Sequence, residues 1–179
     1  MGVRISPLDE HRDFRGSFTE VFRSEWATGL SPVQWNFVRS APGVLRGVHV
    51  HHRHSDYLVL LEGRMTLGLR DLRRESPTRD LATTVTLEGN RLSSVTIPRG
   101  VAHGFLFHEP SLHLYAVSHA WDPGDELGCH WRDPDLGLRW SVEEALISPR
   151  DAGLPPLRAL LDSLEPHQPF PAVPPPPSP

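Results

Sequence analysis

The chain has 179 residues, of which 38% are hydrophobic and 22% charged, a balance typical of one soluble globular domain. Its net charge of −4 provides no electrostatic attraction for nucleic acid or an anionic membrane surface, and no apolar run of about 18 residues predicts a membrane span. The single cysteine excludes an internal disulfide, and the lack of lysine among the 18 basic residues excludes Schiff-base chemistry.

Alternating apolar and polar residues indicate β-strands through most of the chain. The alternation is clear in the segments 64–70, 84–87 and 112–117. Turn-forming residues separate such segments at short intervals, at 62–63, 88–90, 98–100 and 123–124. Many short half-buried strands predict an antiparallel β-sandwich or barrel.

Helical patterns come only near the end of the chain. Ser141–Glu144 has the form of a capping box and predicts a short helix that ends before Pro149. Leucines at 157, 160, 161 and 164 predict an amphipathic helix packed on the sheet. Eight of the 19 prolines lie in the last 14 residues, so we expect one domain over residues 1–165 and a disordered, proline-rich tail over 166–179.

Histidines are concentrated in the segment 46–54, directly before the apolar run 57–61. On a strand, His49 and His51 share one face. A further histidine, His103, follows the turn at 98–100. His113, Tyr115 and His119 lie on one strand face, opposite leucines, and we expect this face to line a polar cavity.

Two kinds of chemistry fit these residues. In the first, a neutral histidine removes a carbon-bound proton, a carboxylate on its far nitrogen holds the tautomer, and Tyr115 returns a proton from the opposite side. In the second, a metal ion is bound by residues that have the spacing of the two cupin motifs, with Asp where Glu is usual: His49, His51, Asp56 and His103. The two schemes compete for His49, because a nitrogen bound to a cation is no longer a free base.

Seven segments resemble, in order, those of dTDP-4-dehydrorhamnose 3,5-epimerases: 13–20, 34–36, 43–49, 71–78, 97–105, 114–115 and 126–140. The resemblance runs from about residue 9 to Asp151. It implies a cupin-type jelly roll and a homodimer whose N-terminal strands cross over. It also implies that no metal or other cofactor is required. With the patterns above, we expect a mainly β, antiparallel jelly roll with short C-terminal helices, and the single cysteine suits a cytoplasmic protein.

The resemblance implies roles for particular residues. His49 corresponds to the catalytic base, Asp151 to the carboxylate that orients it, and Tyr115 to the general acid. Positions that hold the nucleotide or the sugar correspond to Arg15, Phe18, Glu20, Gln34, Asn36, Arg46 and His103. Strict alternation would put Arg46 opposite His49, so this assignment requires a bulge near Gly47.

The implied function is that of a dTDP-4-keto-6-deoxyhexose 3,5-epimerase, or a 3- or 5-monoepimerase, in deoxysugar biosynthesis such as that of dTDP-rhamnose. One departure is that the family's lysine before the Leu-Val strand corresponds to Asp56, or to Tyr57 if the alignment slips by one residue. Three alternatives stay open. The first is a dTDP-4-keto-6-deoxyhexose 3,4-ketoisomerase, because residues 46–51, Arg-Gly-Val-His-Val-His, also resemble a segment of that family. The second is a metal-binding cupin that uses the four ligands named above, and the third is a non-catalytic dTDP-sugar binder.

Overall fold

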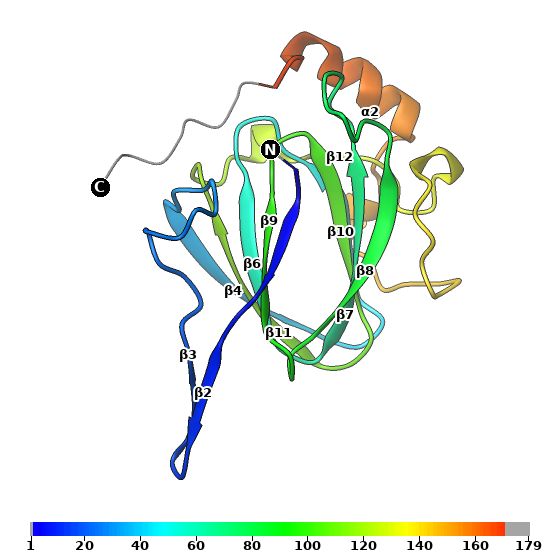
Figure 1. Ribbon diagram of the computed structural model, residues 1–179. Coiled ribbons are helices and arrows are strands. Elements are labelled where there is room, and N and C mark those ends of the chain that lie inside the picture. The colour runs from blue at the N-terminus through cyan, green and yellow to red at the C-terminus, as the bar shows by residue number, and fades with distance from the viewer. Residues whose placement is uncertain (1, 171–179) are drawn as a thin grey trace.

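Two five-stranded antiparallel sheets face each other in the computed structural model, which describes residues 2–170 (Figure 1). The first sheet has, in spatial order, β1 Arg4–Pro7, β9 Ser93–Ile97, β6 Asp56–Glu62, β11 Ser111–Val117 and β4 Gln34–Ser40. The second has, in spatial order, β12 Leu127–Gly128, β5 Leu45–Val50, β10 Val101–Phe107, β7 Arg64–Asp71 and β8 Ala82–Glu88. This arrangement confirms the predicted mainly β, antiparallel jelly roll.

A two-stranded hairpin projects away from the two sheets (Figure 1). It consists of β2 Glu10–Asp13 and β3 Gly16–Thr19. Helices follow only after the last long strand: the 3₁₀ turns η1 Pro123–Asp125, η2 Pro134–Leu136 and η3 Glu165–His167, and the helices α1 Pro149–Ala152 and α2 Leu157–Leu164. Within the described residues, no helix is both long and apolar enough to span a bilayer.

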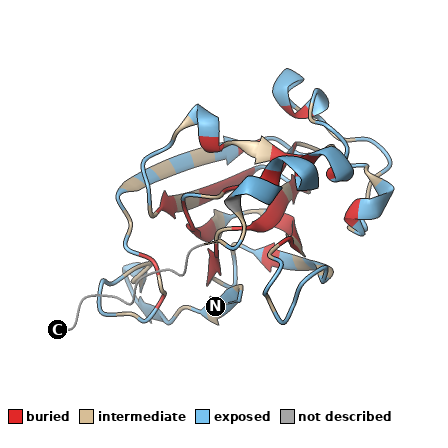
Figure 2. Ribbon diagram, turned by 90° about the horizontal axis from the view of Figure 1, so that it is seen from above, coloured by how far each residue is buried: buried red, intermediate tan, exposed pale blue. Residues whose placement is uncertain are grey.

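The central strands are buried on both faces, so they do not show the half-buried pattern predicted for them. Between the sheets, leucines of β6 and β7 pack with Val95 and Phe107. The outer face of the second sheet is covered by the C-terminal segment, where Trp131 and Leu160 belong to the same buried cluster as Val48 of β5. Figure 2 shows these buried strands beneath exposed outer elements. Only an edge strand such as β8 keeps the predicted alternation, since little covers its outer side.

The C-terminal helix α2 confirms the leucine pattern, with three of its four leucines buried. The helix predicted to begin at Ser141–Glu144 is wrong, because this segment forms bends and irregular backbone without any helical turn. The backbone of Leu146 instead bonds across to Gly43 and Leu45, at 2.8 and 2.9 Å, and nearby apolar side chains join the outer core. Tertiary pairing therefore overrides the local capping signal.

Part of the predicted tail packs against the domain. Pro166 belongs to η3, the Gln168 side chain donates to the Leu72 carbonyl at 3.1 Å, and Phe170 lies against the outer core. The packed structure therefore extends past the predicted boundary at 166. The prediction for residues 171–179 lies outside the described residues.

Candidate active site

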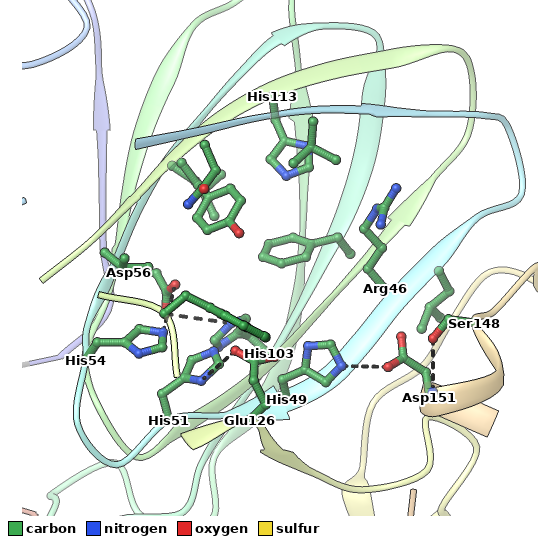
Figure 3. Close-up of a pocket in the computed structure, with 18 of the residues that line it drawn as sticks. Arg46, His49, His51, His54, Asp56, His103, His113, Glu126, Ser148 and Asp151 are labelled. Carbon is green, nitrogen blue, oxygen red and sulfur yellow. Dashed lines mark hydrogen bonds and ion pairs between the residues drawn. The ribbon is translucent and has the colours of Figure 1, made fainter. Parts of the chain in front are cut away.

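A cavity of about 390 Å³ lies between the two sheets (Figure 3). Six of the residues predicted for the site line it: Asn36, Arg46, His49, His103, Tyr115 and Asp151. The predicted metal ligands His51 and Asp56 line it as well. His119 does not, because β11 ends at Val117 and His119 lies exposed beyond it. The prediction of a polar cavity is confirmed, with His119 as its one wrong member.

A bulge in β5 brings Arg46 and His49 to the same cavity. His103 of β10 pairs with His49, but the next residue, Gly104, pairs with Gly47, so that Val48 is the extra residue. Gly47 has φ +118°, and a Cβ there would lie 2.8 Å from the His103 carbonyl oxygen. The bulge required near Gly47 is therefore present, and glycine is what allows the close approach of β10.

His49 is held by a carboxylate from the C-terminal segment. Its Nε2 lies 2.8 Å from Asp151 Oδ1, and the other carboxylate oxygen accepts from the Gly47 amide at 3.1 Å. Ser148 caps α1 by accepting from the Asp151 amide, which fixes the start of this short helix (Figure 3). Two residues that lie 102 positions apart in the chain thus form the predicted pair.

Charge decides which nitrogen of His49 carries the proton. Burial raises the pKa of the Asp151 carboxyl, but hydrogen bonds and charge from His49, with the Gly47 amide and Arg150, lower the pKa to about 2 overall. An ionised Asp151 accepts from Nε2–H, so the lone pair of the neutral ring is on Nδ1. Arg150 Nη2 also lies 2.8 Å from His49 Nε2. In this tautomer Nε2 carries a proton and has no lone pair for Arg150 to donate to, so we assign the role of Arg150 to its ion pairs with Asp151 and Glu126.

Tyr115 projects from the first sheet, whereas His49 belongs to the second, so the two side chains come from opposite walls of the cavity. Burial, followed by the charges of Asp56 and Glu126, raises the pKa of the Tyr115 phenol. The phenol is therefore protonated at neutral pH, as a proton donor must be.

Position 56, not 57, faces the cavity. Asp56 lines it, whereas Tyr57 is buried on the outer face of the sheet and donates from its hydroxyl to the Val21 carbonyl at 2.6 Å. Burial is the main cause that raises the pKa of Asp56, to about 7. The family resemblance predicts a lysine at this position, and the cavity contains the Asp56 carboxylate there instead.

Buried histidines surround Asp56. His103 Nε2 lies 3.8 Å from one carboxylate oxygen and His54 Nε2 lies 3.7 Å from the other. Burial lowers the pKa of His103 to about 3 and that of His51 well below its usual value, so both rings are neutral at neutral pH. Three atoms lie within 4.8 Å of one another: one carboxylate oxygen of Asp56, one ring nitrogen of His51 and one ring nitrogen of His103. Of the four predicted metal ligands, these three converge, whereas His49 pairs with Asp151.

Sequence reasoning missed the acidic residue that organises the histidine loop. Asp125 is fully buried, accepts from the amides of His52 and Arg53, and pairs with the His54 ring at 3.1 Å. Burial raises the pKa of Asp125, but these partners lower it to about 2 overall. In the sequence, Asp125 directly follows the Pro-Gly pair at 123–124, and that pattern predicts a turn but no acidic partner for the histidines.

The remaining predicted substrate residues do not line this cavity. Arg15 and Phe18 lie on the projecting hairpin, where Phe18 is 63% exposed. Glu20 lies against a smaller hollow beside β1, and Gln34 donates to Asn36 Oδ1 at 2.9 Å at the rim. Within the cavity, buried nitrogens of Asn36 and His113 have no hydrogen-bond partner in the described structure, which is typical of a site that receives a polar ligand.

Comparison with known proteins identifies relatives of this chain. The family model described as dTDP-4-dehydrorhamnose 3,5-epimerase matches residues 1–159. A dTDP-4-dehydrorhamnose 3,5-epimerase of Pseudomonas aeruginosa is 37% identical over 151 residues, which cover 78% of this chain and 82% of the relative.

Two solved structures have the same fold. A 3,5-epimerase of Legionella pneumophila in complex with dTDP-4-keto-L-rhamnose has a TM-score of 0.82 at 30% identity, covering 89% of this chain and 91% of its own. A 3'-monoepimerase of Streptomyces bikiniensis in complex with dTDP-quinovose has the same TM-score at 30% identity, covering 92% and 87%. The chain described here belongs to the dTDP-4-dehydrorhamnose 3,5-epimerase family.

Proposed function

We propose that this protein epimerises a dTDP-4-keto-6-deoxyhexose at C3, C5 or both. The observation that carries the proposal is the 2.8 Å contact between His49 and Asp151, in a cavity whose opposite wall holds the Tyr115 phenol. The relatives whose names describe epimerases of such sugars, and the neighbouring structures that hold dTDP-sugars, support this substrate class.

The ketone at C4 makes the neighbouring C–H bonds acidic. His49 Nδ1 takes the proton from C3 or C5, and the electron pair of that bond moves onto the C4 oxygen to give an enolate. Asp151 stabilises the imidazolium that forms, because it is ionised and bonded to the far nitrogen. Tyr115 then gives its proton to the same carbon from the other wall, which inverts the configuration. Solvent resets the protons of His49 and Tyr115.

The nucleotide end of the substrate requires a cation and flat surfaces. Arg46 lines the cavity, and its guanidinium, which donates to Ser40 at 3.1 Å, provides a phosphate contact. Trp121 also lines the cavity and is 53% exposed, which suits an aromatic ring that contacts a base at the rim.

A homodimer accounts for the hairpin residues. Arg15, Phe18 and the 98% exposed Phe14 lie on a projection that makes no wall of the chain's own cavity (Figure 1). In the proposed dimer, the hairpin of one copy brings Arg15 and Phe18 to the nucleotide in the cavity of the other, where an exposed phenyl ring becomes buried.

Incubation of dTDP-4-keto-6-deoxyglucose with the protein in D₂O tests the activity. We expect deuterium at C3, C5 or both, with inverted product. Label at C3 alone defines a 3-monoepimerase, and a carbonyl moved to C3 defines a 3,4-ketoisomerase and contradicts the proposal. Binding of the sugar nucleotide without any exchange defines a non-catalytic binder and contradicts it as well.

A further inference from the structure

The end of the cavity away from Asp151 contains the carboxylate of Asp56, for which residues 2–170 provide no side-chain hydrogen bond. Asp56 is buried, and its ion-pair partners within the described structure are His54 Nε2 at 3.7 Å and His103 Nε2 at 3.8 Å. Both distances exceed those of hydrogen bonds to oxygen, so the carboxylate is close to its neighbours without being bonded to them. A buried carboxylate in this state is costly unless something else binds it.

The backbone fixes the rings of His51 and His103 in one tautomer. His103 Nδ1 lies 3.0 Å from the Val101 carbonyl oxygen, and His51 Nδ1 lies 3.2 Å from that of Asp125. A carbonyl oxygen only accepts, so each Nδ1 carries the proton and each Nε2 has its lone pair free. Metal-binding histidines are usually held in this way by a carbonyl or carboxylate on the far nitrogen.

The spacing of the three side chains suits one ion. Bonds from a transition metal to imidazole nitrogen or carboxylate oxygen are about 2.0–2.2 Å long, which places adjacent ligand atoms about 3–3.5 Å apart. The observed Asp56–His103 separation is 3.8 Å, and all three ligand atoms lie within 4.8 Å of one another. The three side chains lie together at the end of the cavity away from Asp151 (Figure 3), and closing the set around an ion requires their ligand atoms to move closer together.

We propose that His51, Asp56 and His103 bind one divalent transition-metal ion at this end of the cavity. Two neutral imidazoles and one carboxylate are the donor set that suits Fe²⁺, Mn²⁺, Co²⁺, Ni²⁺ or Zn²⁺, and three protein ligands leave positions open toward the cavity for water or a ligand oxygen. Glu126, whose Oε1 lies 3.6 Å from His51 Nδ1, adds negative charge that favours a cation.

A second group, His51, His54 and Asp125, also has ligand atoms close together. Its carboxylate is already occupied, because it accepts from the amides of His52 and Arg53 and pairs with the His54 ring at 3.1 Å. His54 stacks on His51 with ring centroids 3.9 Å apart and so supports the site from behind. The set that contains Asp56 is therefore the one that binds the ion, and His49 is outside it.

Titration of the untagged, chelator-stripped protein with Co²⁺ tests the site, because the visible absorption of Co²⁺ reports nitrogen and oxygen ligation. We expect one ion per chain, displaced by Zn²⁺ and not by Mg²⁺, which prefers oxygen ligands. Asp56→Asn keeps the side-chain shape and removes the charged ligand, and we expect it to weaken binding at least about 100-fold. If Asp56→Asn does not fold, His103→Gln provides the same comparison.

Two variants serve as matched controls. His119→Gln changes an exposed histidine outside the cavity, and His49→Gln changes a cavity histidine outside the three-ligand set. Both are expected to bind Co²⁺ like the unaltered protein. No Co²⁺ binding, or binding that Asp56→Asn leaves unchanged, overturns the proposal, and loss of binding in His49→Gln overturns the three-ligand assignment. The titration requires no sugar nucleotide, so its failure leaves the epimerase proposal intact.

Discussion

The two ends of the cavity contain the same residue type in opposite states of pairing. At one end, His49 has an ionised carboxylate at 2.8 Å that is itself held by a backbone amide. At the other, Asp56 lies 3.8 Å from His103 Nε2 and within 4.8 Å of a ring nitrogen of His51, and these groups are close without hydrogen bonds between them. The group on the far nitrogen of each histidine fixes which nitrogen keeps its lone pair, and an ionised carboxylate there, as at His49, also stabilises the protonated ring, which a neutral backbone carbonyl does less.

The largest effect is expected from His49→Asn, which removes the proposed base. Without it, deuterium exchange at C3 and C5 of dTDP-4-keto-6-deoxyglucose is expected to fall on the order of 10³-fold or more. His119→Asn changes a histidine outside the cavity and is the matched control. If exchange persists in His49→Asn, the base belongs to the other end of the cavity and the comparison between the two ends is reversed.

Asp151→Asn breaks the pairing of His49 while leaving the ring in place. An amide has no charge to stabilise the imidazolium and no longer selects the Nε2–H tautomer, so we expect kcat to fall about 10²–10³-fold. Steady-state kinetics measure this, with exposed Asp162→Asn as the control. A change in KM with unaltered kcat would show that Asp151 acts on substrate binding instead.

Tyr115→Phe separates proton removal from inversion. His49 is still able to exchange a proton on its own face, so we expect deuterium uptake to persist while inverted product forms about 10²-fold more slowly. The chain's other tyrosine provides the control: Tyr57→Phe loses a hydroxyl that bonds to Val21 on the outer face of the same sheet. Equal loss of inversion in both variants would assign the effect to the sheet rather than to proton transfer.

Gly47→Ala disturbs the bulge that presents His49. The new Cβ would lie 2.8 Å from the His103 carbonyl oxygen and 2.9 Å from Gly104 Cα, at φ +118°. We expect the free energy of unfolding to fall by about 2–4 kcal/mol in urea titration. Gly16→Ala has a similar φ of +133° with no heavy atom within 4 Å, so it isolates the backbone term. Equal losses in the two variants would show that crowding at the bulge contributes nothing.

The smallest effect concerns His113, which has neither kind of partner. Burial, followed by the charge of Arg46, lowers the pKa of His113 to about 4. The unfolded chain binds this proton below about pH 6.5 and the native state only below about pH 4, so stability falls as the pH drops between these values. Between pH 7 and 4, we expect the free energy of unfolding to fall by about 1–3 kcal/mol less in His113→Phe than in the unaltered protein, and by the same amount in His119→Asn as in the unaltered protein. Urea unfolding at each pH measures these differences.

Local patterns predicted the strands and α2 because they depend on neighbours in the chain. The alternation in β8 and the leucine spacing of α2 each correspond to one covered face and one exposed face. The prediction was wrong at Ser141–Glu144, where a capping signal was overridden by the backbone bonds of Leu146 to a distant strand. It was incomplete for β7, because alternation does not reveal that Trp140 covers Gly68 from outside.

The sequence by itself determined the residue types of the site, the strands that carry most of them and, through ordered motifs, the family. Only the tertiary structure decided how they pair, since the partner of His49 lies 102 residues away and is brought to it by the C-terminal segment. It also decided that Asp56, not Tyr57, faces the cavity, because strand alternation fixes which residues share a face but not which face is inside. The physical reason is that burial and hydrogen-bond geometry arise between elements, and no local pattern contains them.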